Sequence, residues 1–178
     1  MAESLHRGSV AAKIPPGETG QAAVEFTFIA TTIIVLALAL IDFGRLLNYM
    51  QVMVDLTRQG SNLASRGTDL PTSAAAVIAG DAPLNLSTSG EVIITSVATV
   101  SKVNTITGQA SQGGISRTSH IGKGVGNPAT VPAASSTILQ DGQTMYITEV
   151  FYTFAPITPV GKMLNFVMPS TLYQVAYF

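Results

Sequence analysis

The sequence predicts a protein of the α+β class, in which one long N-terminal helix packs on a small antiparallel sheet of three or four strands. Two observations lead to this prediction. Residues 22–41 form an apolar run, and apolar residues at helical spacing continue beyond it to about residue 66. The rest of the chain contains short segments rich in β-branched and aromatic residues, separated by stretches rich in Gly, Ser and Thr. We therefore divide the chain into a leader (1–20), a helix (21–67) and a β domain with long loops (68–178).

The apolar run is long enough to be a transmembrane helix, since about twenty apolar residues cross a bilayer. Its one charge is Glu25, and a carboxylate at the middle of a membrane helix costs on the order of 2.5–3.5 kcal/mol to insert. Glu25 therefore needs a partner. If the chain is cut after Gly20, the new ammonium group of Gln21 lies one helical turn from Glu25, on the same face. This arrangement is typical of a prepilin.

Three segments carry a resemblance to a known family. They are Gly20-Gln21-Ala22-Ala23-Val24-Glu25-Phe26 with the apolar run behind it, Ile41-Asp42-Phe43-Gly44-Arg45, and the C-terminal stretches 149–156 and 173–178. With these segments the chain resembles TadE-like proteins, the minor pilins or pseudopilins of the Tad (Flp, type IVc) pilus. The resemblance is good over residues 18–66 and fair over 145–178, and it implies a pilin-like fold.

The resemblance also implies roles for particular residues. In the family a prepilin peptidase cuts after the glycine, here between Gly20 and Gln21, and Glu25 becomes the fifth mature residue, which pairs charges during assembly. Recognition and packing of the helix would involve Phe26, Asp42, Gly44 and Arg45. One departure is Phe26, where many Flp-type precursors have tyrosine.

The resemblance implies that the protein is first a precursor in the bacterial inner membrane. Its N-terminus would be cytoplasmic and its β domain periplasmic. The mature protein would then be incorporated into, or prime, a cell-surface pilus for adhesion and surface attachment. Its partners would be the prepilin peptidase, other Tad pilins, the inner-membrane assembly platform and membrane lipid, in a homo- or hetero-oligomeric filament.

Two alternatives remain open. The chain could be a bitopic inner-membrane protein whose β domain binds a partner without polymerising, or it could be the major subunit of a filament. Its size favours a minor pilin, because the major Flp pilins of the resembled family are much shorter and mostly helical.

Residues 1–20 are polar and are expected to form an unstructured cytoplasmic leader. Arginine residues also follow the apolar run, so the N-terminus is placed inside on the prepilin pattern rather than on charge. A secretory signal peptide is the alternative interpretation. The run exceeds the 7–15 residues of a usual signal core, and Glu25 interrupts its start. A membrane anchor, about residues 22–41, is therefore preferred.

Beyond the apolar run, apolar residues at steps of three and four predict that the helix continues along the surface of the β domain. They are Leu46, Tyr49, Met50, Met53, Leu56 and Leu63. Gly67, followed by Asp69-Leu70-Pro71, is expected to end the helix.

Two oppositely charged pairs stand three residues apart on this helix. Asp42 and Arg45 are expected to pair where the helix leaves the membrane, whereas Asp55 and Arg58 are expected to belong to a solvated face.

Three strands are predicted in the β domain, with a weaker fourth. They are Glu91–Val100, Thr144–Phe154 and Thr171–Phe178, and then Ile115–Ile121. Residues 103–114 and 122–143 are rich in small and polar side chains and are expected to be surface loops. Both faces of the strand at 144–154 are apolar, so we expect the helix to cover one face and loops or neighbours the other.

The composition excludes several classes of protein. Charged residues make up 11% of the chain and the net charge is −1, so no basic surface is expected for nucleic acid. There is no cysteine for a disulfide or a thiolate metal site. His6 and His120 are isolated, and the acidic residues of the β domain are scattered. We therefore expect no catalytic residue, no metal, no cofactor and no enzymatic activity.

Overall fold

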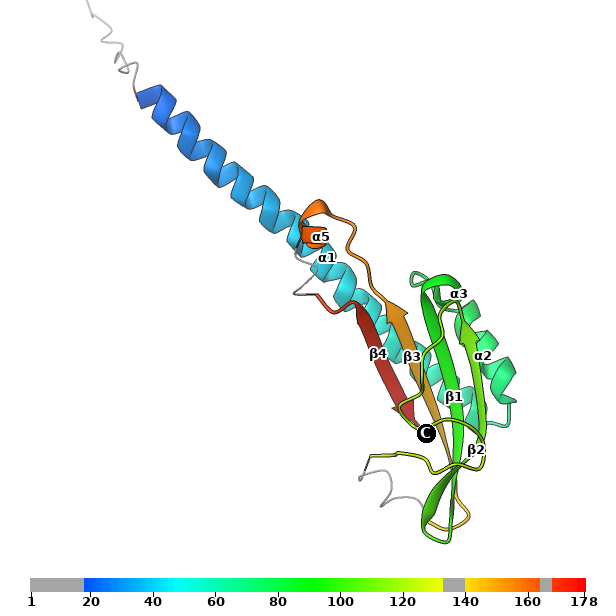
Figure 1. The fold of residues 1–178 in the computed structure, drawn as a ribbon. Helices are drawn as coiled ribbons and strands as arrows, with labels where there is room; N and C mark the ends of the chain where they lie inside the picture. Colours follow the sequence, from blue (N-terminus) through cyan, green and yellow to red (C-terminus); the bar gives the residue numbers. More distant parts are fainter. Residues whose placement is uncertain (1–17, 133–139, 164–167) are drawn as a thin grey trace, which may run out of the picture.

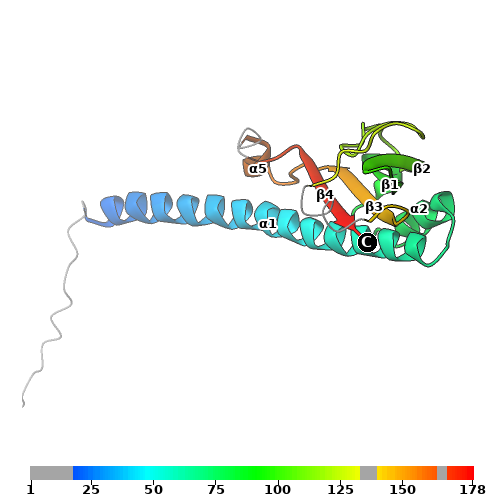
Figure 2. The same ribbon diagram turned by 90° about the horizontal axis from the view of Figure 1, so that it is seen from below.

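The computed structural model describes residues 18–132, 140–163 and 168–178. A single long helix, α1 (Glu18–Ser65), forms one side of the molecule. Its second half lies along a small sheet, and its first half projects free of the rest of the described chain (Figures 1 and 2). The predicted α+β class, with a long N-terminal helix packed on an antiparallel sheet, is confirmed.

The sheet has four strands, β1 (Gly90–Val100), β2 (Val103–Gly113), β3 (Thr144–Thr153) and β4 (Thr171–Tyr177), in the order β2-β1-β3-β4. All neighbouring strands are antiparallel. Strands β1 and β2 form a hairpin whose two turn residues, Ser101 and Lys102, have φ values of 53° and 66°. Two successive left-handed residues are the geometry that matches the twist of a two-residue hairpin.

The predictions for β1, β3 and β4 are confirmed, each within one residue at its ends. The prediction for the fourth strand is wrong: residues 115–121 form no strand, and β2 lies within the segment predicted as a loop. Strand β2 is at the edge of the sheet, and Ile106 is its one buried residue. An edge strand of this kind lacks the apolar pattern from which strands are predicted.

A short second helix, α2 (Leu70–Ala79), follows α1 and was not predicted. The segment Asp69-Leu70-Pro71 indeed follows the end of α1, but it also begins α2. Asp69 is the N-cap residue, and its carboxylate accepts a hydrogen bond of 3.0 Å from the backbone N–H of Thr72. Proline is well accommodated in the first turn because its missing N–H has no helical partner there. Two shorter helices are α3 (Leu86–Ser89) and α5 (Pro159–Met163).

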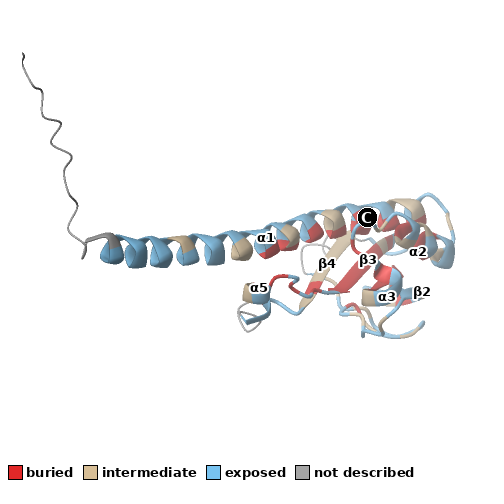
Figure 3. Cartoon of the chain, turned by 90° about the horizontal axis from the view of Figure 1, so that it is seen from above, coloured by how far each residue is buried: buried red, intermediate tan, exposed pale blue. Residues whose placement is uncertain are grey.

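The main core lies between α1, α2 and one face of the sheet. Leu46, Tyr49, Met53 and Leu56 of α1 are buried, as their spacing predicts, whereas Met50 is exposed. They pack against residues of β1, β3 and α2, including Val92, Ile94, Val150, Tyr152, Ala74 and Val77. Burial along α1 is confined to its second half, on the face toward the sheet (Figure 3).

A smaller cluster covers the other face of the sheet. It consists of Val97, Met145 and Ile147 from β1 and β3 and Ile121 from the loop that follows β2. Strand β3 is therefore covered on both sides, as its two apolar faces predict.

Part of the loop 122–132 runs along the outer edge of β2. The backbone N–H of Ile106 donates to the carbonyl of Asn127 at 2.9 Å, and the N–H of Ala129 donates to the carbonyl of Asn104 at 2.8 Å. The hairpin end of this edge is thus paired with a segment of the same chain.

Candidate functional site

The first half of α1 exposes a long apolar surface. The helix is long and apolar enough to cross a membrane, and none of its most apolar window is buried inside the protein. Phe26, for example, is 72% exposed, and most of the large side chains as far as Phe43 are exposed as well. Apolar side chains around the whole circumference of a helix are typical of a membrane span. The helix therefore indicates a membrane anchor.

Gly20 and Gln21 lie in the first turns of α1. Residues 1–17 of the predicted unstructured leader lie outside the described residues, and residues 18–20 are helical rather than unstructured. Because the first four N–H groups of a helix have no partner in the helix, this end holds together by few hydrogen bonds. The peptide bond between Gly20 and Gln21 is thus placed where local unwinding costs little.

Glu25 is one turn further along α1 and is exposed. Its Oε1 accepts a hydrogen bond of 3.0 Å from Nε2 of the Gln21 side chain. In the uncleaved chain the Gln21 side chain is therefore already the partner of the carboxylate. Cleavage after Gly20 would add a positive charge on the same residue.

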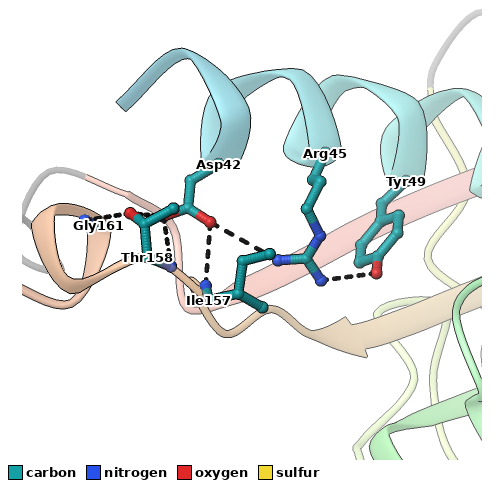
Figure 4. Close-up of polar contacts among 6 residues, drawn as sticks. All are labelled: Asp42, Arg45, Tyr49, Ile157, Thr158 and Gly161. Atoms are coloured by element: carbon teal, nitrogen blue, oxygen red, sulfur yellow. Dashed lines mark hydrogen bonds and ion pairs between the residues drawn. The ribbon is translucent and has the colours of Figure 1, made fainter. Parts of the chain in front are cut away.

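Asp42 is fully buried where α1 reaches the head, the part of the molecule that the sheet and its covering helices form. Its Oδ1 accepts a hydrogen bond of 2.9 Å from the backbone N–H of Ile157. Its Oδ2 accepts one of 3.2 Å from the N–H of Thr158 and one of 2.5 Å from the Thr158 hydroxyl. The Thr158 hydroxyl in turn accepts a hydrogen bond of 3.0 Å from the N–H of Gly161 (Figure 4). We call these contacts of Asp42 with Ile157 and Thr158 the Asp42 latch.

Arg45 extends the Asp42 latch toward the core. Its Nη1 lies 3.6 Å from Oδ1 of Asp42, which makes the predicted ion pair, and its Nη2 donates a hydrogen bond of 2.8 Å to the hydroxyl of Tyr49. The guanidinium carbon also lies 5.2 Å from the ring centre of Tyr49 and 5.8 Å from that of Phe154. Asp42 is held mainly by the segment after β3, and Arg45 mainly by aromatic rings.

The remaining residues of the predicted site have different surroundings. Gly44 is exposed, and a Cβ at this position would meet nothing within 4 Å. Asp55 and Arg58 are both exposed, in agreement with a solvated face.

The sequence patterns did not indicate Thr158 and Gly161 as partners of Asp42, because more than a hundred positions separate them from it. In the described part of the chain, no group of three or more acidic or histidine side chains is placed to hold a metal ion.

On the far face of the sheet, Glu149 is buried and holds the loop 115–121 in place. It accepts hydrogen bonds from the Ser119 hydroxyl, from the backbone N–H of His120 and from the Tyr173 hydroxyl. Burial, followed by the neighbouring charge of Glu149, raises the pKa of Tyr173. The centre of the His120 ring lies 4.4 Å from the centre of the Tyr173 ring. These contacts fasten the loop across the sheet, which explains why it forms no strand.

The comparison with known families concerns the helix just described. Residues 20–62 match the TadE-like protein family. The resemblance inferred from the prepilin-like motif is thereby confirmed over the anchor and most of the helix that packs on the head. Neither curated proteins nor solved structures provide a significant match. The TadE-like match suggests that the protein is associated with a Tad pilus.

Proposed function

We propose that this TadE-like protein is a minor pilin or pseudopilin, cut by a prepilin peptidase after Gly20 and then assembled into, or used to prime, a Tad pilus that attaches cells to surfaces. The observation that carries the proposal is the family match over residues 20–62. That segment combines the expected cleavage position with the apolar half of α1 and most of the half that packs on the head.

The exposed surface of α1 supports a partner in addition to lipid. At about 1.5 Å per residue, residues 22–41 already span the roughly 30 Å of a bilayer core. Yet Phe43, Leu47 and Met50 continue an exposed apolar stripe beyond the span, at helical spacing and on a face not covered by the head. The helix of a neighbouring subunit would remove this stripe from water.

Small residues on α1 favour close packing of such a neighbour. Ala23, Ala30, Ala37 and Gly44 follow each other at seven-residue intervals, which places them along one side of the helix. No contact with the described residues requires the glycine at position 44, since a Cβ there would meet none of their atoms within 4 Å. Small residues allow the backbones of two helices to approach closely in a membrane.

Glu25 would set the register of the assembly. In the apolar interior of a bundle, a bare carboxylate is costly, so a neighbour would be favoured only at the position where an ammonium group of Gln21 meets Glu25. The exposed carboxylate, with its side-chain contact to Gln21, is accessible to such a partner.

Cleavage is tested by the intact mass and N-terminal sequence of the protein from native membranes, with and without the prepilin peptidase. We expect a mature chain that begins at Gln21 only when the peptidase is present. A chain that keeps its leader in both cases would favour the bitopic membrane protein, and a cut beyond Ala39 would identify a signal peptide.

Assembly is tested by Glu25→Ala, with Asp55→Ala as a matched control on the solvated face of the same helix. We expect Glu25→Ala to insert into the membrane normally but to be depleted from purified pili, and Asp55→Ala to be incorporated normally. Normal incorporation of Glu25→Ala would rule out the charge-pairing role.

A further inference from the structure

The segment after β3 lies beside α1 at the level where the apolar span ends. In both ribbon views, α5 is the described part of the head nearest to the projecting half of the helix (Figures 1 and 2). We call residues 157–163 the α5 segment. Because the Asp42 latch binds its first two residues directly, the α5 segment is held next to the first residue after the span.

The position of the α5 segment is tightly determined. A Cβ on Gly161 would overlap Oδ2 of Asp42 and the side chain of Pro156. Only glycine therefore lets this helix approach the carboxylate so closely. With the hydrogen bonds to Ile157 and Thr158, this contact fixes the height of the segment along α1.

The outer surface of the α5 segment is apolar with one positive charge. Ile157 is 57% exposed and Met163 is 80% exposed, although both are large apolar side chains. Lys162, between them in sequence, is exposed as well. A pair of exposed apolar residues would be ordinary elsewhere on the head, but here they lie next to the end of a membrane span.

The thickness of the bilayer core determines how deep these residues would lie relative to the lipid headgroups. Residues 22–41 cover about 30 Å of helix, which matches the hydrocarbon core, so Asp42 lies at the boundary with the headgroups. Groups that the Asp42 latch holds at this height lie at the same boundary. Amphipathic segments at this depth insert apolar side chains about 5–10 Å into the interface, and lysine reaches the phosphates.

We propose that the α5 segment is a second membrane contact of the precursor, in which Ile157 and Met163 enter the headgroup region and Lys162 faces the lipid phosphates. The contact would prevent the head from swinging freely about the span, with Asp42 as the residue that positions it. This inference rests on the membrane-anchored precursor of the proposed function, and it is independent of cleavage and of polymerisation.

The full uncleaved chain in lipid vesicles provides the test. The protein contains no tryptophan, so Met163→Trp and Ile157→Trp each introduce a single tryptophan, whose emission is selectively excited at about 295 nm or longer wavelengths. Lipids brominated near the headgroup end of their chains quench tryptophan at that depth. The matched control is Val125→Trp, because Val125 is similarly exposed and belongs to the loop bonded to the hairpin end of β2.

We expect blue-shifted emission and strong quenching for Met163→Trp and Ile157→Trp, and neither for Val125→Trp. A further variant, Leu36→Trp, reports on the span itself and is measured with lipids brominated deeper in their chains, because Leu36 lies inside the span. Quenching of Leu36→Trp without quenching at positions 157 and 163 would overturn the inference and leave the anchor intact. Absence of quenching at Leu36→Trp would overturn both, and equal quenching at Val125→Trp would overturn a contact specific to the α5 segment.

The role of the Asp42 latch is tested in the Met163→Trp background. Asp42→Asn should reduce the quenching of Trp at position 163, whereas Asp55→Asn, with the same loss of charge on a solvated face, should not. Unchanged quenching in the Asp42→Asn variant would overturn the positioning role of Asp42.

Discussion

The two halves of α1 are both rich in apolar residues, but they differ in what surrounds them. Between Gly20 and Ile41 the apolar side chains point in all directions and are largely exposed, whereas between Asp42 and Ser65 one stripe of them is buried against the sheet and a second, with Phe43, Leu47 and Met50, stays exposed near the start of this half. The second half is an amphipathic helix of a globular domain, and the first half has the all-round apolar surface of a membrane helix. One continuous helix thus carries two kinds of surface, and the buried Asp42 marks where the first gives way to the second.

Gly44 and Gly60, which both lie in the second half of α1, differ in what surrounds them. A Cβ at Gly44 would meet nothing within 4 Å. A Cβ at Gly60 would lie 2.8 Å from Cγ2 and Oγ1 of Thr148 and 3.1 Å from Cγ2 of Val77. Among the described residues, packing therefore requires a glycine at position 60 and does not require one at position 44.

The largest contrast is expected for apolar truncations in the two halves. Met53 is fully buried in the core, so Met53→Ala should lower the free energy of unfolding by about 2–5 kcal/mol. Leu36→Ala should change the unfolding of the head by less than about 0.5 kcal/mol, because Leu36 is exposed in the projecting half. Urea unfolding in one mild detergent, followed by the circular dichroism of the sheet, measures both. Equal losses would mean that the projecting half packs on the head.

A smaller contrast is expected for the two aspartates of the second half. Asp42→Ala removes the acceptor of Ile157 and Thr158 and should cost about 1.5–3 kcal/mol of unfolding free energy, the range for hydrogen bonds to a charged group. Asp55→Ala should cost less than about 0.5 kcal/mol, since Asp55 is exposed. Hydrogen exchange at Ile157 and Thr158 should accelerate in the Asp42 variant alone, and unchanged exchange there would contradict the contacts described for Asp42.

A third contrast, in which the two changes have opposite signs, concerns Gly60 and Gly44. Gly60→Ala should destabilise the head by about 1–3 kcal/mol because the added methyl group has no space. Gly44→Ala should stabilise the isolated protein by about 0.5–1 kcal/mol through the higher helix propensity of alanine. Thermal unfolding in the same detergent compares them. If Gly44→Ala also lowered the midpoint, a contact at Gly44 within the chain would have to exist.

The parts of the fold that the sequence predicts are those with a regular apolar pattern. The helix, its buried face and strands β1, β3 and β4 follow from such patterns. Strand β2 does not, because its single buried residue, Ile106, leaves no alternation to detect. The segment 115–121 has some strand character, but Glu149 binds its backbone and side chains and fastens it across the sheet instead.

The residues of the candidate site also differ in whether a local sequence pattern reveals them. Gly20, Gln21 and Glu25 are recognised as a short motif within seven positions, so sequence alone finds them. The pair Asp42–Arg45 was expected from its spacing, and it exists at 3.6 Å. The hydrogen bonds of Asp42 to Ile157 and Thr158 depend on the chain returning to α1 after β3, which no local pattern reveals.

The backbone pairing of Asn104 and Ile106 of β2 with Asn127 and Ala129 has a consequence for contacts between copies of the protein. An exposed strand edge is a template on which the strand of another molecule can add, and so is a route to aggregation. At the hairpin end of β2 this template is already occupied by Asn127 and Ala129 of the same chain. A strand of another copy therefore cannot add at the hairpin end of β2 without first displacing Asn127 and Ala129.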